Sequence, residues 1–231
     1  MLLEELLSAG LGTTDETVLG RFRTYYEYLE EINAVMNLTA ISGETDVAQL
    51  HFLDCAAVAA LPEFRAGRVI DVGTGAGFPG LVLKILRPEL ELTLLDSLDK
   101  RVGFLKNTCD KLGFADVNCV HARAEEAPKE YRGAFDTVTS RAVARLNLLS
   151  ELCLPLVKKG GVFIAMKGPD CADELKEAER GIALLGGKTD RIASYTVPGT
   201  DIVHTAVIIR KLHDTPARFP RRWAQIKKQP L

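Results

Sequence analysis

Apolar residues in the first 62 positions recur at spacings of three and four, which is the period of an amphipathic helix. Thr13 and Glu16 have the spacing of a capping box, and the positions that follow predict a first helix that runs to about Met36. The segment TDVAQLHFLDCAAVAAL predicts a second helix that ends at Pro62. We therefore expect residues 1–62 to form an N-terminal helical extension that packs as a cap.

From residue 68 the pattern changes to short β-branched runs that alternate with helical stretches, as in βαβ units of a parallel sheet. Five strands are predicted in this part of the chain: RVIDVG (68–73), LTLLDS (92–97), VNCVHARA (117–124), FDTVTS (135–140) and GVFIAMKG (161–168). Further on, RIASYTV and IVHTAVIIR are joined only by PGTD, which predicts an antiparallel hairpin.

A parallel sheet that ends in one hairpin indicates a particular α/β fold class. It is the Rossmann-like arrangement of seven-stranded S-adenosylmethionine-dependent methyltransferases, whereas the usual dinucleotide fold closes with another parallel strand. We therefore assign residues 63–214 to a domain of this class, with the helical extension before it.

The composition is that of a globular chain, and its charge is unevenly distributed. The 231 residues are 47% hydrophobic. No apolar run approaches the roughly 20 residues that span a bilayer, and MLLEELLSAG lacks the basic region of a secretion signal, so no membrane partner is expected. Of 29 basic and 31 acidic residues, five basic and no acidic ones lie in positions 215–231, which leaves a net charge of −7 for positions 1–214. Residues 215–231 are therefore treated as a basic C-terminal tail.

The cysteines and histidines give no sign of a metal site. The five cysteines are an odd number, form no CxxC pair and have no histidine at zinc-ligand spacing. The four histidines also lack metal-like spacing. We interpret the cysteines as reduced thiols of a cytoplasmic protein and predict no bound metal.

The segment DVGTGAGFPG follows the first predicted strand and precedes a helix opened by Pro79, which places backbone N–H groups at a helix N-terminus. Two classes of ligand compete for such a loop. GAGFPG formally fits the dinucleotide pattern GxGxxG, whereas an acid followed by three alternating glycines fits the loop of S-adenosylmethionine enzymes. The second pattern comprises Asp71, Gly73, Gly75 and Gly77.

Two further observations favour S-adenosylmethionine over a dinucleotide. None of the five tyrosines has a lysine four residues later, so the Tyr-x-x-x-Lys pair of redox chemistry is missing. Asp71, two positions before the first glycine, suits a cofactor that carries an amino group. Asp96, at the end of the second strand, would accept hydrogen bonds from ribose hydroxyls in either case and does not discriminate.

Several stretches together resemble the bacterial 16S rRNA methyltransferase RsmG family, also called GidB. They are MNLTAI (36–41), HFLDC (51–55), DVGTGAGFPGLVL (71–83), LLDSLDKRVGFL (94–105), SRAVA (140–144), MKG (166–168) and FPRRWAQIKKQPL (219–231). They occur in the family's order and cover nearly the whole chain. The tail departs from the pattern, because the family usually has a glycine and a proline between the arginines and the lysine.

The resemblance implies that a methyl group is transferred from S-adenosylmethionine to N7 of guanine 527 of 16S rRNA, either as free RNA or in the small ribosomal subunit. It also implies cofactor positions at Gly73 and Phe78 in the loop, Ala124 and Glu125 after the third strand, and Arg141 in SRAVA. Taken without the resemblance, Glu125 is more typical of a solvated acid, and Arg141 of either a surface charge or a site residue.

Methylation at N7 predicts a site without a catalytic base, because this nitrogen carries an in-plane lone pair and no proton. Consistent with this, TSRAVAR follows the fourth strand in place of the Asn/Asp-Pro-Pro-aromatic motif that holds exocyclic amines. We therefore assign no catalytic residue. Arg141 and Lys167, at strand ends, are candidates to stabilise a phosphate or to donate to guanine O6, with solvated charges as the alternative.

Other residues are candidates to contact RNA. His51 in HFLDC could contact RNA, with a structural histidine as the alternative. Asn37 in MNLTAI could contact RNA or the cofactor as part of a lid, with a loop-capping side chain as the alternative. In the tail, Phe219 and Trp223 would offer stacking surfaces. Its cations are expected to act on the substrate and not on the cofactor: Arg218, Arg221, Arg222, Lys227 and Lys228.

Three alternative functions stay open at this point. The chain could be a methyltransferase that acts on another RNA position, one that acts on a small molecule, or a nonenzymatic RNA-binding protein with the same fold. The intact loop and Asp96 argue against the last of these, and no DNA partner is expected.

Overall fold

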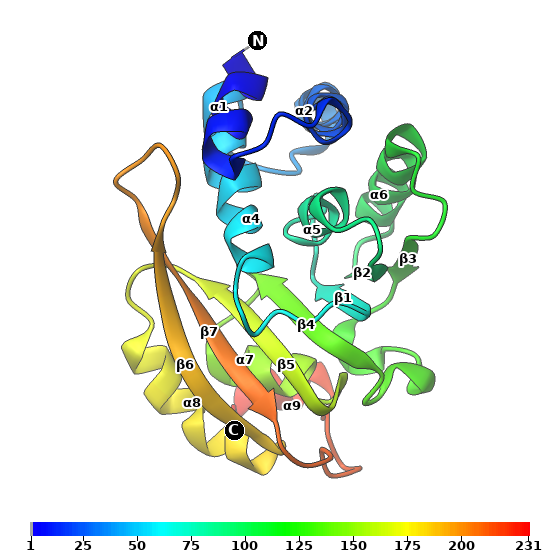
Figure 1. The fold of residues 1–231 in the computed structure, drawn as a ribbon. Coiled ribbons are helices and arrows are strands. Elements are labelled where there is room, and N and C mark those ends of the chain that lie inside the picture. Colours follow the sequence, from blue (N-terminus) through cyan, green and yellow to red (C-terminus); the bar gives the residue numbers. More distant parts are fainter. Residues whose placement is uncertain (1) are drawn as a thin grey trace.

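The computed structural model describes residues 2–231 and has a seven-stranded sheet with helices on both faces (Figure 1). The strand order is β3-β2-β1-β4-β5-β7-β6; β7 is antiparallel to both of its neighbours, and the other adjacent strands are parallel. The predicted fold class, a parallel sheet that ends in a hairpin, is thereby confirmed. The strands are β1 (Arg68–Val72), β2 (Glu91–Asp96), β3 (Asn118–His121), β4 (Phe135–Arg141), β5 (Val157–Lys167), β6 (Gly187–Thr196) and β7 (Val203–Lys211).

The helices form two layers, one on each face of the sheet (Figure 1). The first layer contains α1 (Leu2–Leu11), α2 (Glu16–Met36), α3 (Glu44–Val47), α4 (Asp54–Ala59), α5 (Gly80–Leu86) and α6 (Asp99–Leu112). The second contains α7 (Leu146–Cys153), α8 (Ala172–Leu184) and α9 (Trp223–Lys228). The second predicted helix is present as α3 and α4 with a π-helical turn, Ala48–Leu53, between them. Among the described residues, no helix has both the length and the apolar character that crossing a membrane requires.

The start of α2 differs from the predicted capping box. Asp15 is the N-cap, and its Oδ1 accepts hydrogen bonds from the backbone N–H groups of Thr17 at 2.8 Å and Val18 at 3.3 Å. The hydroxyl of Thr13 accepts from the N–H of Asp15. The predicted box was wrong because an aspartate immediately before the first helical residue satisfies the free N–H groups of the first turn directly.

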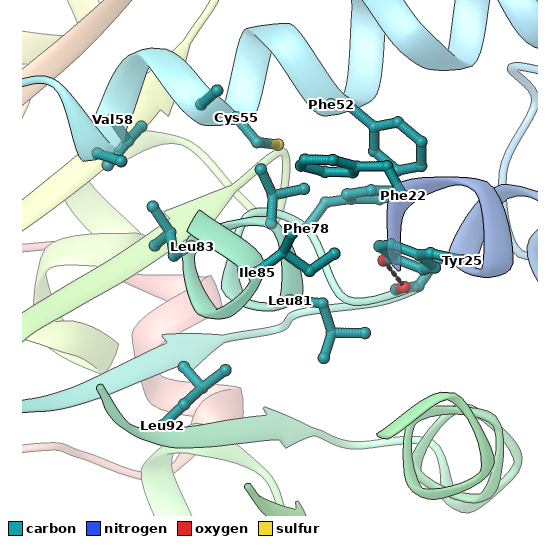
Figure 2. Packing of buried hydrophobic residues seen from close by; sticks show 14 of the residues in the cluster. Phe22, Tyr25, Phe52, Cys55, Val58, Phe78, Leu81, Leu83, Ile85 and Leu92 are labelled. Carbon is teal, nitrogen blue, oxygen red and sulfur yellow. Dashed lines mark hydrogen bonds between the residues drawn. The ribbon is translucent and has the colours of Figure 1, made fainter. Parts of the chain in front are cut away.

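Alternation along the strands divides the core between the two faces. Successive side chains of a strand point to opposite faces, so Ile164 lies in the core beneath the first helical layer and Ala165 in the core beneath the second. The N-terminal helices contribute to the first core. Figure 2 shows Tyr25 and Phe52 packed close to Phe78 of the glycine loop. The hydroxyl of Tyr25 also donates to the carbonyl of Ala76 at 2.5 Å, so α2 supports the loop directly.

The C-terminal tail packs along the second face of the sheet. Phe219 is 4% exposed and Ile226 is fully buried, and both belong to the core on that face. The guanidinium of Arg132 donates to the carbonyls of Thr215, Pro216 and Phe219. These contacts fix the path of the tail from the end of β7 to α9.

Candidate functional site

The carboxyl ends of β1, β2, β4 and β5 meet at one edge of the sheet. β1 pairs with β2 on one side and with β4 on the other. The chain runs from β1 to β2 on one side and from β4 to β5 on the other, so the connections after β1 and β4 diverge. In open α/β sheets such a divergence opens the crevice where ligands bind. Three pockets lie along this edge, and they contain most of the predicted site residues.

The glycine loop between β1 and α5 needs glycine for two different reasons. Gly75 has a φ of 61°, and a side chain there would meet no atom within 4 Å, so the backbone conformation alone requires glycine. A Cβ on Gly73 would lie 2.4 Å from Cγ2 of Val143, so this position also permits close approach of the loop after β4.

Asp71 supports this loop from within the core. Its Oδ2 accepts hydrogen bonds from Thr74 Oγ1 at 2.6 Å and from the N–H of Gly80 at 2.9 Å, and its Oδ1 accepts from Thr139 Oγ1 at 3.0 Å. Burial raises the pKa of Asp71 to about 6 against the effect of these hydrogen bonds. The carboxylate of Asp71 is fully buried and ties the loop to α5 and β4. This geometry therefore does not support the predicted contact between Asp71 and the amino group of a cofactor.

Asp96 occupies the predicted position at the end of β2. It is 3% exposed; its Oδ2 accepts from the N–H of Gly75 at 2.9 Å and its Oδ1 from the N–H of Leu98 at 3.0 Å. The guanidinium of Arg101 lies 3.7 Å away. A carboxylate can accept about four hydrogen bonds, so Asp96 keeps capacity for the hydroxyls of a ribose.

Two adjoining pockets surround Asp96. The loop pocket, of about 340 Å³, is lined by Leu38, Thr39, His51, Gly73, Thr74, Gly75, Ala76, Phe78, Asp96, Ser97, Arg101, Arg141, Ala142 and Val143. The β3-side pocket, of about 170 Å³, is lined by Val72, Gly73, Leu95, Asp96, Ser97, Ala122, Arg123, Ala124, Glu125, Val143, Leu152 and Trp223. Gly73, Asp96, Ser97 and Val143 line both, so the two form one elongated site.

This elongated site fits S-adenosylmethionine. The backbone of Gly73 and the carboxylate of Asp96 line its centre, Gly75 lines the loop pocket, and apolar side chains with Ala124 and Glu125 surround one end. Glu125 accepts a hydrogen bond from Nε of Arg123 at 2.7 Å, and its side chain is only 6% exposed. It is therefore not the solvated acid that its sequence context suggests. Seven of the nine predicted cofactor residues line the site; Asp71 and Gly77 instead shape the loop.

A third pocket, of about 490 Å³, lies beyond the loop pocket toward β5 and β7 and is called here the β5-side pocket. It shares His51, Arg141 and Ala142 with the loop pocket. These three residues therefore form a common wall. The full lining is Ile41, Leu50, His51, Asp54, Arg141, Ala142, Met166, Lys167, Gly168, Ile202 and His204.

Hydrogen bonds within the common wall fix the tautomer of His51. Nη2 of Arg141 lies 2.8 Å from Nδ1 of His51, and Nε2 of His51 lies 2.8 Å from Oγ1 of Thr39. Arginine can only donate, so Nδ1 accepts and neutral His51 carries its proton on Nε2, which donates to Thr39. Burial, together with the charge of Arg141, lowers the pKa of His51 to about 3. His51 is therefore neutral at physiological pH.

The wall is held by an aromatic ring on one side and a carboxylate on the other. The Phe78 ring stacks on the His51 ring at 4.2 Å and lies 4.9 Å from the Arg141 guanidinium. Nη1 of Arg141 donates to Oδ2 of Asp54 at 3.2 Å, and Oδ1 of Asp54 accepts from His204 Nδ1 at 2.7 Å and Tyr195 Oη at 2.9 Å.

Asp54, Tyr195 and His204 were not predicted from the sequence as parts of the site. One signal was available in the sequence: Asp54 follows His51 by three residues, a spacing that places two side chains on one helical face. Tyr195 and His204 belong to the hairpin and meet Asp54 only through the tertiary fold.

The predicted RNA-binding residues outside the tail have well-defined positions. Asn37 is the left-handed C-cap of α2, with a φ of 51°, and its backbone N–H donates to the carbonyl of Asn33. Lys167 lines the β5-side pocket, where Nζ donates to the carbonyl of Ala144 at 2.6 Å and pairs with Glu174 at 2.8 Å. Lys167 is thus a held charge and not a freely solvated one.

Within the tail, the structure separates anchors from exposed cations. Arg221 forms ion-pair hydrogen bonds with the fully buried Glu151, at 2.6 Å between Nη2 and Oε2. The RNA-stacking role predicted for Phe219 is wrong because its ring is buried. Trp223 lines the β3-side pocket together with Ala124 and Glu125. The remaining predicted cations are exposed: Arg218, Arg222, Lys227 and Lys228.

Solved structures with the same fold include methyltransferases. An O-methyltransferase from Bacillus cereus in complex with SAH matches with a TM-score of 0.58 at 17% identity, covering 82% of this chain and 91% of that one. TrmN from Thermus thermophilus matches with a TM-score of 0.55 at 21% identity, covering 68% of this chain and 48% of that one. The fold and the elongated site define a methyltransferase that uses S-adenosyl-L-methionine as its cofactor.

Sequence relatives identify the family within this class. The model of the family described as rRNA small subunit methyltransferase G, or GidB, matches residues 19–203. A protein named ribosomal RNA small subunit methyltransferase G from Clostridium perfringens strain 13 is 46% identical over 214 residues, covering 91% of this chain and 90% of that protein. One of the same name from Lactobacillus acidophilus is 45% identical over 220 residues, with coverage of 91% and 90%. This chain belongs to the rRNA small subunit methyltransferase G family.

Proposed function

We propose that the protein transfers a methyl group from S-adenosylmethionine to N7 of guanine 527 of 16S rRNA, in the cytoplasm, on the small ribosomal subunit or its free RNA. The observation that carries this proposal is the wall of His51, Arg141 and Ala142 that the cofactor site shares with the β5-side pocket. Ligands seated in the two pockets would lie next to each other along these three residues. The family relatives, which are named for small-subunit ribosomal RNA, support the substrate class.

The β5-side pocket has the size and lining that a nucleobase requires. At about 490 Å³ it lies within the usual range of ligand pockets. Ile41, Leu50 and Met166 offer apolar surface to the flat faces of a base, while Lys167 and His204 offer polar groups to its edge. Lys167 could donate to guanine O6, and His204, whose Nδ1 is engaged by Asp54, keeps Nε2 for a second hydrogen bond.

The polar groups at the wall suit a reaction that removes no proton before methyl transfer. When bound, the cofactor supplies an electrophilic methyl group, which the lone pair of N7 can attack directly. His51 is not placed to act as a base, because Nδ1 accepts from Arg141 and Nε2 donates to Thr39. The chain's contribution is to hold both reactants in line, which can supply about 7–11 kcal/mol of the acceleration.

The exposed tail cations complete the proposal. Arg218, Arg222, Lys227 and Lys228 remain available for phosphate contacts, while positions 1–214 carry a net charge of −7. Such contacts position RNA without specifying its sequence. Base identity would then depend on the β5-side pocket.

The test is methyl transfer from labelled S-adenosylmethionine to small subunits that lack the modification, to free 16S rRNA, and to a pool of small-molecule acceptors. The expected result is label at one guanine of the rRNA, mapped by chain cleavage at 7-methylguanine. Label at another position, or on a small molecule alone, would contradict the proposal. His204→Ala should lower kcat/KM with cofactor affinity unchanged, and Lys159→Ala, at the opposite edge of the sheet, is the matched control.

A further inference from the structure

Trp223 lies at the cofactor site, although it belongs to the tail and follows β1 by some 150 positions along the chain. It is the first residue of α9 and is partly buried against the core of the second face. Among the described residues that line the β3-side pocket, it is the only aromatic one. The other lining side chains are small, aliphatic or charged.

The position of Trp223 is fixed by anchors on both sides of it. Two residues before it, Arg221 is paired with the buried Glu151 of α7. Three residues after it, Ile226 is fully buried. Across the ring, the guanidinium of Arg123 lies 5.8 Å from the indole centroid, and Nε of Arg123 donates to Glu125. These contacts hold the indole of Trp223 in place as one wall of the β3-side pocket.

The order of groups along the elongated site indicates which part of the cofactor this wall meets. Asp96, which suits the ribose hydroxyls, lines both pockets, so the ribose belongs at their junction. The loop pocket reaches Arg141 and the β5-side pocket, where the methyl group must be delivered. The β3-side pocket extends the other way and is left for the adenine, whose flat face an indole can contact.

We propose that Trp223 forms one wall of the adenine end of the cofactor site, so that the C-terminal tail takes part in binding S-adenosylmethionine. Trp223 lies in the tail segment RRWAQIKKQPL, at the start of α9. The contact does not depend on which RNA base is methylated.

The experiment uses the fact that Trp223 is the only tryptophan of the chain. Its fluorescence is followed while S-adenosylhomocysteine is added to the full-length protein, and the same titration is performed by calorimetry. We expect a saturable change of emission whose midpoint agrees with the calorimetric Kd. Trp223→Ala should weaken binding of S-adenosylhomocysteine about tenfold, as expected when an aromatic ring that stacks on a base is removed. Trp223→Phe should stay within about threefold because it keeps a ring.

Two controls separate this contact from general damage to the tail. Gln225→Ala changes an exposed residue of the same helix and should bind as the wild type does. Thermal unfolding shows whether Trp223→Ala remains folded. Unchanged affinity in Trp223→Ala would overturn the proposal. So would a loss of affinity without any change of wild-type emission at saturation, because the loss would then come from a displaced tail and not from the ring.

Discussion

At the scale of single residues, the guanidinium of Arg141 connects the parts of the site. It donates to the carbonyl of Leu50, to His51 and to Asp54, and its face lies against Phe78. Each of these partners comes from a segment far from Arg141 in the chain. A planar group with five N–H donors can serve them together, which the single ammonium of a lysine cannot.

Asp96→Asn tests the ribose position. The substitution removes a charge and leaves an amide that cannot accept as many hydrogen bonds, so binding of S-adenosylmethionine should weaken by about 1–3 kcal/mol. Asp99→Asn, three residues later and 85% exposed, is the matched control and should change binding little. Both are measured by calorimetry. An Asp96→Asn variant with wild-type affinity would remove Asp96 from the cofactor site.

His51 predicts a pH dependence of stability. Its pKa is about 3 in the folded protein against an ordinary value of 6.5, so between these values the unfolded state binds more protons and stability falls as pH decreases. The raised pKa of Asp71 has the opposite effect, because between pH 3.8 and about 6 the folded state binds more protons and stability rises as pH decreases. The contribution of His51 is therefore isolated by comparison with a variant. From pH 7 to 5.5, wild type should lose about 1 kcal/mol more than His51→Gln in urea unfolding. Equal losses would show that His51 titrates normally.

At the scale of elements, the strands, the glycine loop and Asp96 were predictable because each has a local pattern. The helix around His51 was predicted as continuous, but a π-helical turn divides it, and single-sequence periodicity does not reveal an extra residue within a turn. The roles of Asp54 and Trp223 were not predictable for a stronger reason. Asp54 meets His204 from 150 positions away, and no periodicity encodes such a contact.

The tail contains one strong anchor whose removal should destabilise the fold. Arg221→Ala would leave the carboxylate of Glu151, which is 0% exposed, without its charged partner. A loss of about 3 kcal/mol in the free energy of unfolding is expected, since unpaired buried charges are costly. Glu151→Gln in the Arg221→Ala background should recover part of this loss by removing the charge. A loss below about 0.5 kcal/mol for Arg221→Ala would place the pair among ordinary surface interactions.

The exposed tail cations should affect RNA binding alone. Because Trp223 belongs to the same tail, deletion of the tail would mix two effects, and alanine at Arg218, Arg222, Lys227 and Lys228 is the cleaner change. The log–log salt dependence of RNA binding should become shallower by about 0.7–0.9 for each phosphate that the variant no longer neutralises. Cofactor affinity should not change. Alanine at Lys159 and Lys188, exposed at the amino edge of the sheet, is the matched control. An unaltered salt slope in the four-site variant would exclude the tail as an RNA-binding element.

At the scale of the whole molecule, three segments outside the parallel part of the sheet support the pockets of the site. The N-terminal helices share the first core with the sheet, and Tyr25 bonds to the loop carbonyl of Ala76. The hairpin places Tyr195 and His204 against Asp54 at the far side of the β5-side pocket. The tail brings Trp223 to the other end. The cofactor site and the β5-side pocket are therefore built by segments from both ends of the chain as well as by the parallel strands.

The central claim is that this arrangement delivers a methyl group to N7 of guanine 527, and replacement of that single atom tests it most directly. Small subunits are reconstituted with 16S rRNA that carries either guanine or 7-deazaguanine at position 527, in which a C–H group replaces N7. Methyl transfer from labelled S-adenosylmethionine is then measured on both. We predict incorporation of one methyl group per particle with guanine and none above background with 7-deazaguanine. Equal incorporation into both particles would contradict the account, because the acceptor would then be a different atom.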